Sequence, residues 1–93
     1  MTENQPTIPN RLTMGDILDV VKSASYTRLA DSTTTVCQLT LKNGYTVLGH
    51  SACIDPNLFN QTVGEKVAWD NAIDKIWELE GYLLQQRRFE AGL

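Results

Sequence analysis

Two side chains of this sequence, Cys37 and His50, could together form a nucleophile and its general base. A cysteine attacks a substrate as a thiolate, and a neighbouring imidazole can take the proton. Both residues belong to β-rich segments that flank Asn43-Gly44, a dipeptide that favours a two-residue type I′ hairpin turn. With these two residues as the loop, Cys37 faces His50 on the neighbouring strand.

The same pairing favours a structural role for Cys37 and His50. It puts them on the face that we expect to pack in the core, whereas a catalytic cysteine needs partial exposure, an oxyanion donor and an orienting third group. His50 is the only histidine, so a metal site would need carboxylates or a second chain. We therefore expect no enzyme, no metal site and no cofactor. The expected core face carries Cys37, Leu39, Leu41, Leu48, His50 and Ala52, and the opposite face carries Val36, Thr40, Tyr45 and Val47.

The elements that hold these residues predict an α+β fold. Thr13, followed three residues later by Asp16, is close to a capping-box pattern and predicts a short N-terminal helix over residues 13–24. The polar residues 31–33 predict a turn. We expect a three-stranded antiparallel meander with strands over residues 26–30, 34–42 and 45–53.

A long C-terminal helix, packed on this sheet, is the largest predicted element. Asp55-Pro56 predicts a short turn over residues 56–59, and the helix then continues to about Phe89. Roughly 30 residues at 1.5 Å each give about 45 Å, so part of the helix should project or pack on another subunit. Gly64 and Gly81 interrupt it, which indicates close backbone approach or a kink. Its apolar residues recur at helical spacing: Trp69, Ala72, Ile73, Ile76, Leu79, Leu83 and Leu84.

The composition excludes several classes of protein. A net charge of −3, with Arg87-Arg88 as the only adjacent pair of arginines, argues against binding duplex nucleic acid. No apolar run approaches the roughly 20 residues that span a membrane, and residues 1–10 lack the features of a secretion signal. Cys37 and Cys53 lack the spacing of a zinc site. We therefore expect a cytosolic protein.

The length predicts one small domain that would be more stable with a second copy bound to it. We expect a flexible arm over residues 1–12, where Pro6 and Pro9 stand among polar residues, and a single α+β domain over residues 13–93. Chains of this size bury only roughly 60 to 65% of their unfolded surface, so a second copy would help to cover the long helix.

Four segments of the sequence together form a specific pattern. They are Leu41-Lys-Asn-Gly-Tyr-Thr-Val, Ser51-Ala-Cys-Ile-Asp-Pro, Phe59-x-x-x-x-Gly64 and Asn71-Ala-x-x-Lys-Ile-Trp77-x-Leu-Glu-Gly-Tyr-Leu-Leu84. This pattern resembles a family of small proteins encoded by tailed bacteriophages. The similarity covers roughly residues 35–88, and many members of that family have no assigned function.

The sequence is also similar to the first-described type of phage anti-Thoeris sponge proteins. This resemblance implies a non-enzymatic protein that acts in the cytoplasm of the infected bacterial host. It implies sequestration of a cyclic ADP-ribose signal and, in some members, of cyclic dinucleotides or trinucleotides. It also implies assembly as a dimer or hexamer.

A nucleotide pocket needs an aromatic surface, an amide and a guanidinium, and this sequence has all three. Phe59 or Trp69 could stack on a base, Asn71 could bind ribose or base edges, and Arg87 or Arg88 could bind phosphate. The resemblance selects Asn71 and Arg88 first. These two residues are 17 positions apart on the predicted helix, or roughly 25 Å, so both can contact one ligand only from different subunits of an antiparallel pair.

Each of these residues also has a structural interpretation. Trp69 can anchor the core, Phe59 can pack at the start of the helix, and Asn71 can lie on a solvated stripe. Arg87 and Arg88 suit a helix C-terminus without any ligand. The alternative function is a phage protein that binds and inhibits a host protein through its long helix.

Overall fold

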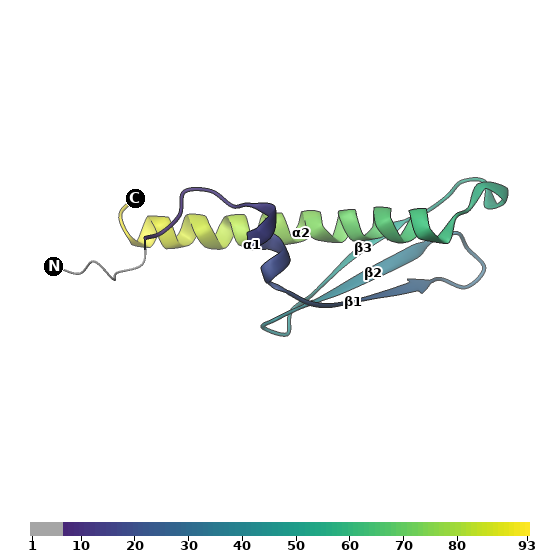
Figure 1. Ribbon diagram of the computed structural model, residues 1–93, viewed down its shortest axis with the longest axis horizontal. Coiled ribbons are helices and arrows are strands. Elements are labelled where there is room, and N and C mark those ends of the chain that lie inside the picture. Colours follow the sequence, from purple (N-terminus) through teal and green to yellow (C-terminus); the bar gives the residue numbers. More distant parts are fainter. Residues whose placement is uncertain (1–6) are drawn as a thin grey trace.

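The computed structural model describes residues 7–93 and shows an α+β fold in which one long helix lies on a three-stranded antiparallel sheet (Figure 1). The sheet order is β1-β2-β3, so consecutive strands are neighbours. The predicted fold class is therefore confirmed. The elements are α1 (Met14–Asp19), β1 (Val21–Arg28), β2 (Thr35–Leu41), β3 (Thr46–Ser51), the 3₁₀ turn η1 (Pro56–Leu58) and α2 (Gln61–Glu90).

The predicted N-terminal arm, residues 1–12, lies partly outside the described residues. Residues 7–13 run back along the C-terminal part of α2 (Figure 1). There Arg88 Nη1 donates a hydrogen bond to the Pro9 carbonyl oxygen at 3.0 Å. This contact joins the two ends of the described chain.

Helix α1 begins where the sequence predicts and ends earlier. The Thr13 side chain accepts from the Asp16 N–H at 3.2 Å, and Asp16 Oδ2 accepts from the Thr13 N–H at 2.8 Å, which completes a capping box. The predicted end near residue 24 is wrong, because β1 begins at Val21 and pairs with β2. The strand ladder satisfies these backbone groups in place of a helix, so the first strand also begins before the predicted residue 26.

The β2–β3 hairpin has a three-residue loop, so the predicted type I′ turn is wrong. Leu41 N–H donates to the Tyr45 carbonyl at 2.8 Å and closes a loop over residues 42–44. Gly44 has a φ of 92°, while Asn43 is not among the residues with positive φ. Positive φ at the last loop residue alone is typical of a type I turn followed by a glycine bulge.

This difference of one loop residue reverses the faces of β3. Cys37 lies opposite Gly49, and His50 lies opposite Val36. Val47 is therefore buried, whereas Leu48 and His50 are exposed. The expected pairing of Cys37 with His50 is wrong because successive side chains of a strand point to opposite faces.

The residues predicted for the core face of β2 are confirmed, and those predicted for β3 are not. Cys37, Leu39 and Leu41 are buried. Ala52, which was also expected on this face, is exposed beyond the end of β3. The main core cluster consists of Ile17, Cys37, Leu39, Leu41, Val47, Ala68, Ala72, Ile73 and Ile76.

Helix α2 lies over β3 and β2, at a distance set by a glycine. A Cβ atom added to Gly49 would lie 2.2 Å from the Ala72 nitrogen and 2.3 Å from the Ala68 carbonyl oxygen. The helix backbone therefore rests directly on β3. Strand β1 is left almost wholly exposed from Lys22 to its end.

The predicted extent of α2 is confirmed, and one of its two glycines makes a close contact. Asn60 Oδ1 caps the helix by accepting from the Val63 N–H at 3.1 Å. A Cβ atom on Gly64 would lie 3.1 Å from Thr35 Oγ1, whereas one on Gly81 would meet nothing within 4 Å. Close approach thus explains Gly64 and leaves Gly81 unexplained.

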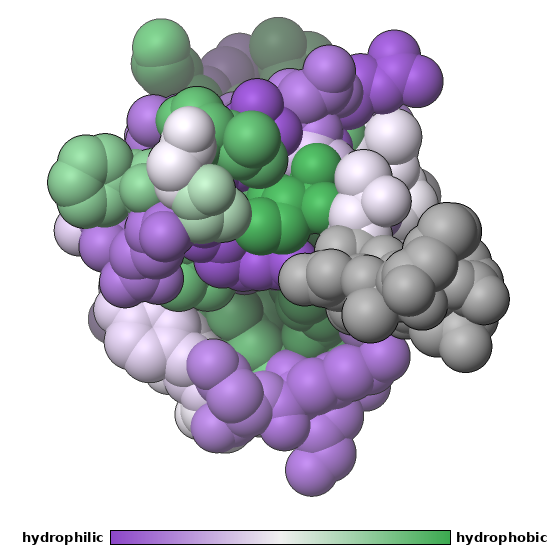
Figure 2. Space-filling model, turned by 90° about the vertical axis from the view of Figure 1, so that its left-hand side faces the viewer, coloured by the Kyte–Doolittle hydropathy of each residue, from purple (hydrophilic) through white to green (hydrophobic). Residues whose placement is uncertain are grey.

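The C-terminal part of α2 extends beyond the sheet (Figure 1). Figure 2 views the molecule from the side on which α2 ends, and apolar surface alternates there with hydrophilic surface. Within residues 7–93, no helix combines the length and apolar character needed to cross a membrane. The exposed large apolar side chains of this part of α2 are Leu79, Tyr82, Leu83 and Phe89.

Candidate ligand-binding groove

A groove of about 530 Å³ lies where the edge of the sheet meets the start of α2. Strand β3 is an edge strand, and α2 overhangs it along one side. We call this the edge groove. It is lined by Thr33, His50, Ser51, Ala52, Cys53, Leu58, Phe59, Asn60, Val63, Gly64, Val67 and Asn71.

Apolar side chains form one wall of the edge groove. Val63 and Val67 lie one turn apart on α2 and are 58% and 42% exposed. Leu58 and Phe59, at the end of η1, extend this wall. Small-molecule sites are concave, largely apolar, and usually between about 300 and 1,000 Å³ in volume, so this groove has the size and lining of such a site.

Asn71 supplies the main polar group on the α2 side of the groove. Its Nδ2 donates to the His50 carbonyl oxygen at 2.7 Å, across the edge of β3. A side-chain amide has two N–H donors and one acceptor oxygen, so one such bond leaves capacity for a ligand. The bond also fixes the amide at the groove rim.

Hydroxyl groups hold the loops that flank the groove. Ser51 Oγ donates to the Gly64 carbonyl at 2.6 Å. Thr33 Oγ1 donates to the Cys53 carbonyl and accepts from the Cys53 N–H, the latter at 3.1 Å. These bonds tie the end of β3 to both α2 and the β1–β2 loop.

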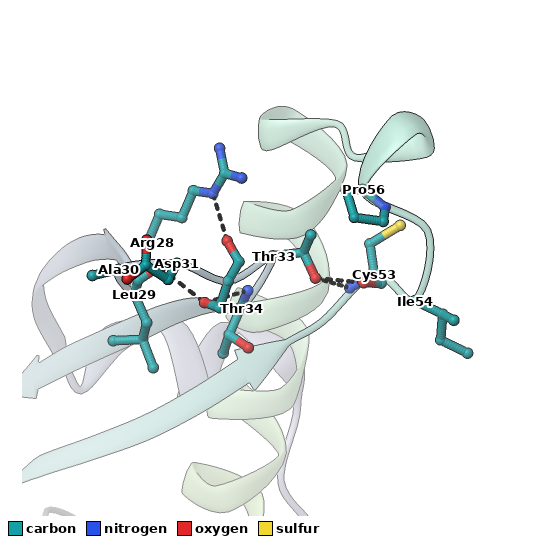
Figure 3. A pocket seen from close by; sticks show the side chains of 10 residues that line it. Arg28, Leu29, Ala30, Asp31, Thr33, Thr34, Cys53, Ile54 and Pro56 are labelled. Atoms are coloured by element: carbon teal, nitrogen blue, oxygen red, sulfur yellow. Dashed lines mark hydrogen bonds between the residues drawn. The ribbon is translucent and has the colours of Figure 1, made fainter.

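A second, more open groove of about 770 Å³ lies beside the first and shares Thr33 and Cys53 with it (Figure 3). We call this the loop groove, because residues 28–34 line most of it. Arg28 Nε donates to the Ser32 carbonyl at 3.0 Å, and the Ser32 hydroxyl donates to the Leu29 carbonyl at 2.9 Å. Its remaining lining residues are Cys53, Ile54 and Pro56.

One stacked pair connects the two grooves. The Cζ atom of Arg28 lies 4.1 Å from the centroid of the Phe59 ring, which is within the range of a cation–π interaction. Arg28 belongs to the loop groove and Phe59 to the edge groove. The pair therefore stands at the boundary between them.

The structure brings together two of the five predicted ligand-binding residues. Phe59 and Asn71 line the edge groove. Trp69 lies almost on the opposite side of α2 from Asn71 and packs against the core cluster. Arg87 and Arg88 are in the last turn of α2, where Arg88 contacts Pro9. Within one chain, Asn71 and the two arginines remain at opposite ends of the helix.

Three residues that form the grooves, Val63, Val67 and Arg28, were not identified from the sequence. Val63, Val67 and Asn71 recur at a spacing of four, and this second stripe of α2 is a signal that could have identified the valines. Arg28 had no such signal, because its partner Phe59 is distant in the sequence. His50 was placed on the wrong face by the hairpin register.

The Cys37 thiol is not poised for nucleophilic chemistry. Burial raises its pKa, and a hydrogen bond with Tyr26 only partly offsets this effect. The pKa of Tyr26 is also raised, mainly by burial and then by Cys37. A thiol with a raised pKa stays protonated at neutral pH and is a poor nucleophile. In the part of the chain that the structure describes, no three His, Cys, Asp or Glu residues are grouped to hold a metal ion.

Comparison with models of known protein families gives a match. A sequence model of the family described as "Phage protein (N4 Gp49/phage Sf6 gene 66) family" matches residues 12–88. No curated protein and no solved structure matches the chain.

Proposed function

The chain belongs to the N4 Gp49/phage Sf6 gene 66 family of phage proteins, and from this premise we propose that it binds and sequesters a nucleotide signal of bacterial immunity without converting it. The observation that carries the proposal is the edge groove. Phe59 and Asn71, which sequence reasoning selected for a nucleotide, both line it. The resemblance to phage sponge proteins supplies the ligand class, a cyclic ADP-ribose isomer or a cyclic oligonucleotide.

The chemistry of the groove suits a nucleotide. A purine ring is flat and apolar on both faces, and the wall formed by Val63, Val67 and Phe59 offers matching surface. Base edges and ribose hydroxyls need directional partners, which the Asn71 amide can supply. These groups bind and orient a ligand.

We further propose that the protein acts as a homo-oligomer, a dimer or hexamer, in the cytoplasm of the infected host. The exposed apolar side chains Leu79, Tyr82, Leu83 and Phe89 offer a surface for a second copy. In an antiparallel pairing of two α2 helices, Arg88 and Arg87 of the second copy would approach Asn71. Trp69 would then serve the fold rather than the ligand.

Calorimetric titration with cyclic ADP-ribose isomers, cyclic dinucleotides and cyclic trinucleotides tests this proposal. We expect saturable binding to at least one of them at micromolar protein, and recovery of chemically unchanged ligand when the complex is heated. Asn71→Ala should weaken binding at least about tenfold, because a hydrogen bond to the ligand is lost. Gln85→Ala, an exposed substitution elsewhere on α2, is the matched control.

Flat titrations across the whole panel would refute nucleotide sequestration. Native mass spectrometry of the same sample reports the number of subunits and any co-purified nucleotide. A strictly monomeric protein that still binds its ligand would refute the contribution of Arg88 from a second copy.

The second candidate is inhibition of a host protein through α2. It is favoured by the same exposed apolar side chains, which resemble the face of an amphipathic helix that docks in a groove. A stoichiometric partner recovered from host lysate, lost in Leu83→Glu, together with flat nucleotide titrations, would support it. Nucleotide binding without such a partner would favour sequestration.

A further inference from the structure

Arg28 is a cation without a carboxylate partner within residues 7–93. Among the described residues, the single ion pair is Lys66 with Asp70, at 2.9 Å. A guanidinium has five N–H donors, and Arg28 uses its Nε–H on the Ser32 carbonyl. Figure 3 shows the rest of the guanidinium pointing away from the loop that its Nε contacts. Donors on both terminal nitrogens therefore remain available.

The position of Arg28 adds to an existing positive potential. It stacks on Phe59, the residue directly before the α2 cap Asn60. The start of a helix has free N–H groups and carries the positive end of the helix dipole. The first turn of α2 contains no acidic residue that would compensate it. A cation beside an uncompensated helix start is unfavourable, and a bound anion would stabilise both.

The loop groove gives an anion room at this point. Arg28 lines it, and its one acidic lining residue, Asp31, is exposed and makes no ion pair with Arg28. An anion on the terminal guanidinium nitrogens would lie next to the Phe59 ring and therefore beside the edge groove.

We propose that Arg28 binds a phosphate group of the nucleotide whose base lies in the edge groove, so that one ligand spans the Arg28–Phe59 pair. This inference rests on the proposed function and specifies it. The ligand carries at least one phosphate, and a single chain supplies the base wall, the amide and the phosphate contact. An arginine suits this role because its planar donors match phosphate oxygens in pairs.

The main test compares Arg28 variants by titration with cyclic ADP-ribose and cyclic di-AMP, and with adenosine as the phosphate-free reference. Arg28→Gln should weaken binding of the phosphate-bearing ligands by about tenfold or more, because a charged hydrogen bond is lost. It should also reduce the dependence of affinity on salt, and leave adenosine binding unchanged. Arg28→Lys keeps the positive charge but lacks the paired N–H donors of the guanidinium. Its affinity for the phosphate-bearing ligands should lie between those of Arg28→Gln and the wild type.

Arg11→Gln is the control, since it removes one positive charge at a position outside the proposed site, whereas Arg88→Gln tests the alternative contact from a second copy. Equal losses in Arg11→Gln and Arg28→Gln would indicate a general charge effect and overturn the inference. A loss confined to Arg88→Gln would place the phosphate at the end of α2 and overturn it as well. Thermal unfolding of each variant shows whether the fold is retained.

Inorganic pyrophosphate separates this inference from the proposed function. If no nucleotide binds but pyrophosphate binds the wild type and not Arg28→Gln, the phosphate subsite stands and sequestration of a nucleotide signal fails. If neither nucleotides nor pyrophosphate bind, both fail. If nucleotides bind equally to wild type and Arg28→Gln, only the Arg28 subsite fails.

Discussion

The two halves of α2 have different relations to the rest of the molecule. Residues 61–77 rest on the sheet with their backbone close to Gly49, and they carry four of the nine residues of the main core cluster. Residues 78–90 extend beyond the sheet and contain one buried apolar residue, Leu84. The first half presents the valine wall of the edge groove, while the second presents exposed apolar side chains.

Under the proposed function, this difference would let one helix serve two purposes. Close packing against β3 holds the first half rigidly, so a groove along its side keeps its shape. The second half is held by residues near the N-terminus, as the contact of Arg88 with Pro9 shows. Its apolar surface is free for another molecule. The first half is therefore suited to a ligand and the second half to a protein surface.

The largest predicted contrast comes from truncating one apolar side chain in each half. Ile76→Ala removes a fully buried side chain and should lower the free energy of unfolding by about 2 to 5 kcal/mol. Leu83→Ala, at a side chain 54% exposed in the single chain, should change it by less than about 0.5 kcal/mol at protein concentrations where the chain is a monomer. Urea unfolding monitored by circular dichroism measures both. A comparable loss in Leu83→Ala, growing with protein concentration, would show that the projecting half is covered in solution.

A matched pair of glycine substitutions should give the next effect. Gly49→Ala puts a methyl group within 2.3 Å of the α2 backbone and should cost about 1 to 3 kcal/mol, since backbone atoms cannot move aside as a side chain can. Gly81→Ala meets nothing within 4 Å and should stabilise the helix by up to about 1 kcal/mol. Thermal unfolding compares them. An unchanged melting temperature in Gly49→Ala would mean that α2 can shift on the sheet without cost.

The smallest predicted effect is a loss of stability at alkaline pH. Burial raises the pKa of Cys37 and of Tyr26 in the folded protein. The unfolded chain then loses these protons at lower pH than the folded chain. The contribution of the two groups to the free energy of unfolding is therefore fully present below about pH 8.5 and declines as pH rises further. Cys37→Ala and Tyr26→Phe should each make the decline shallower in urea unfolding between pH 7 and 10. A free energy of unfolding that rises over this pH range would contradict the raised pKa values of Cys37 and Tyr26.

Local signals were sufficient for the elements that depend on a few neighbouring residues. The Asp55 and Asn60 caps and the apolar periodicity predicted η1 and α2 correctly, because helix bonds join residues close in sequence. The capping box at Thr13 predicted where α1 begins. It did not predict where α1 ends, since pairing of Val21 with Leu41 on β2 decides that point.

The register of the β2–β3 hairpin could not be predicted from the local sequence. Asn43-Gly44 is compatible with a two-residue or a three-residue loop, and both keep the strands antiparallel. The choice between them decides whether Gly49 or His50 faces α2. Only Gly49 leaves room for the helix backbone, so packing of distant residues selects the longer loop.

The sequence by itself determined the caps, the long helix, the antiparallel meander and the candidacy of Phe59 and Asn71. Each follows from the spacing of residues within a single segment, because local backbone geometry fixes where residues of a given spacing lie on a helix or strand. Tertiary structure alone decided that Phe59 and Asn71 share a groove, that Trp69 faces away from it, and that Arg28 stacks on Phe59. Those relations join β1, η1 and α2, and only the packing of α2 on the sheet brings these elements together.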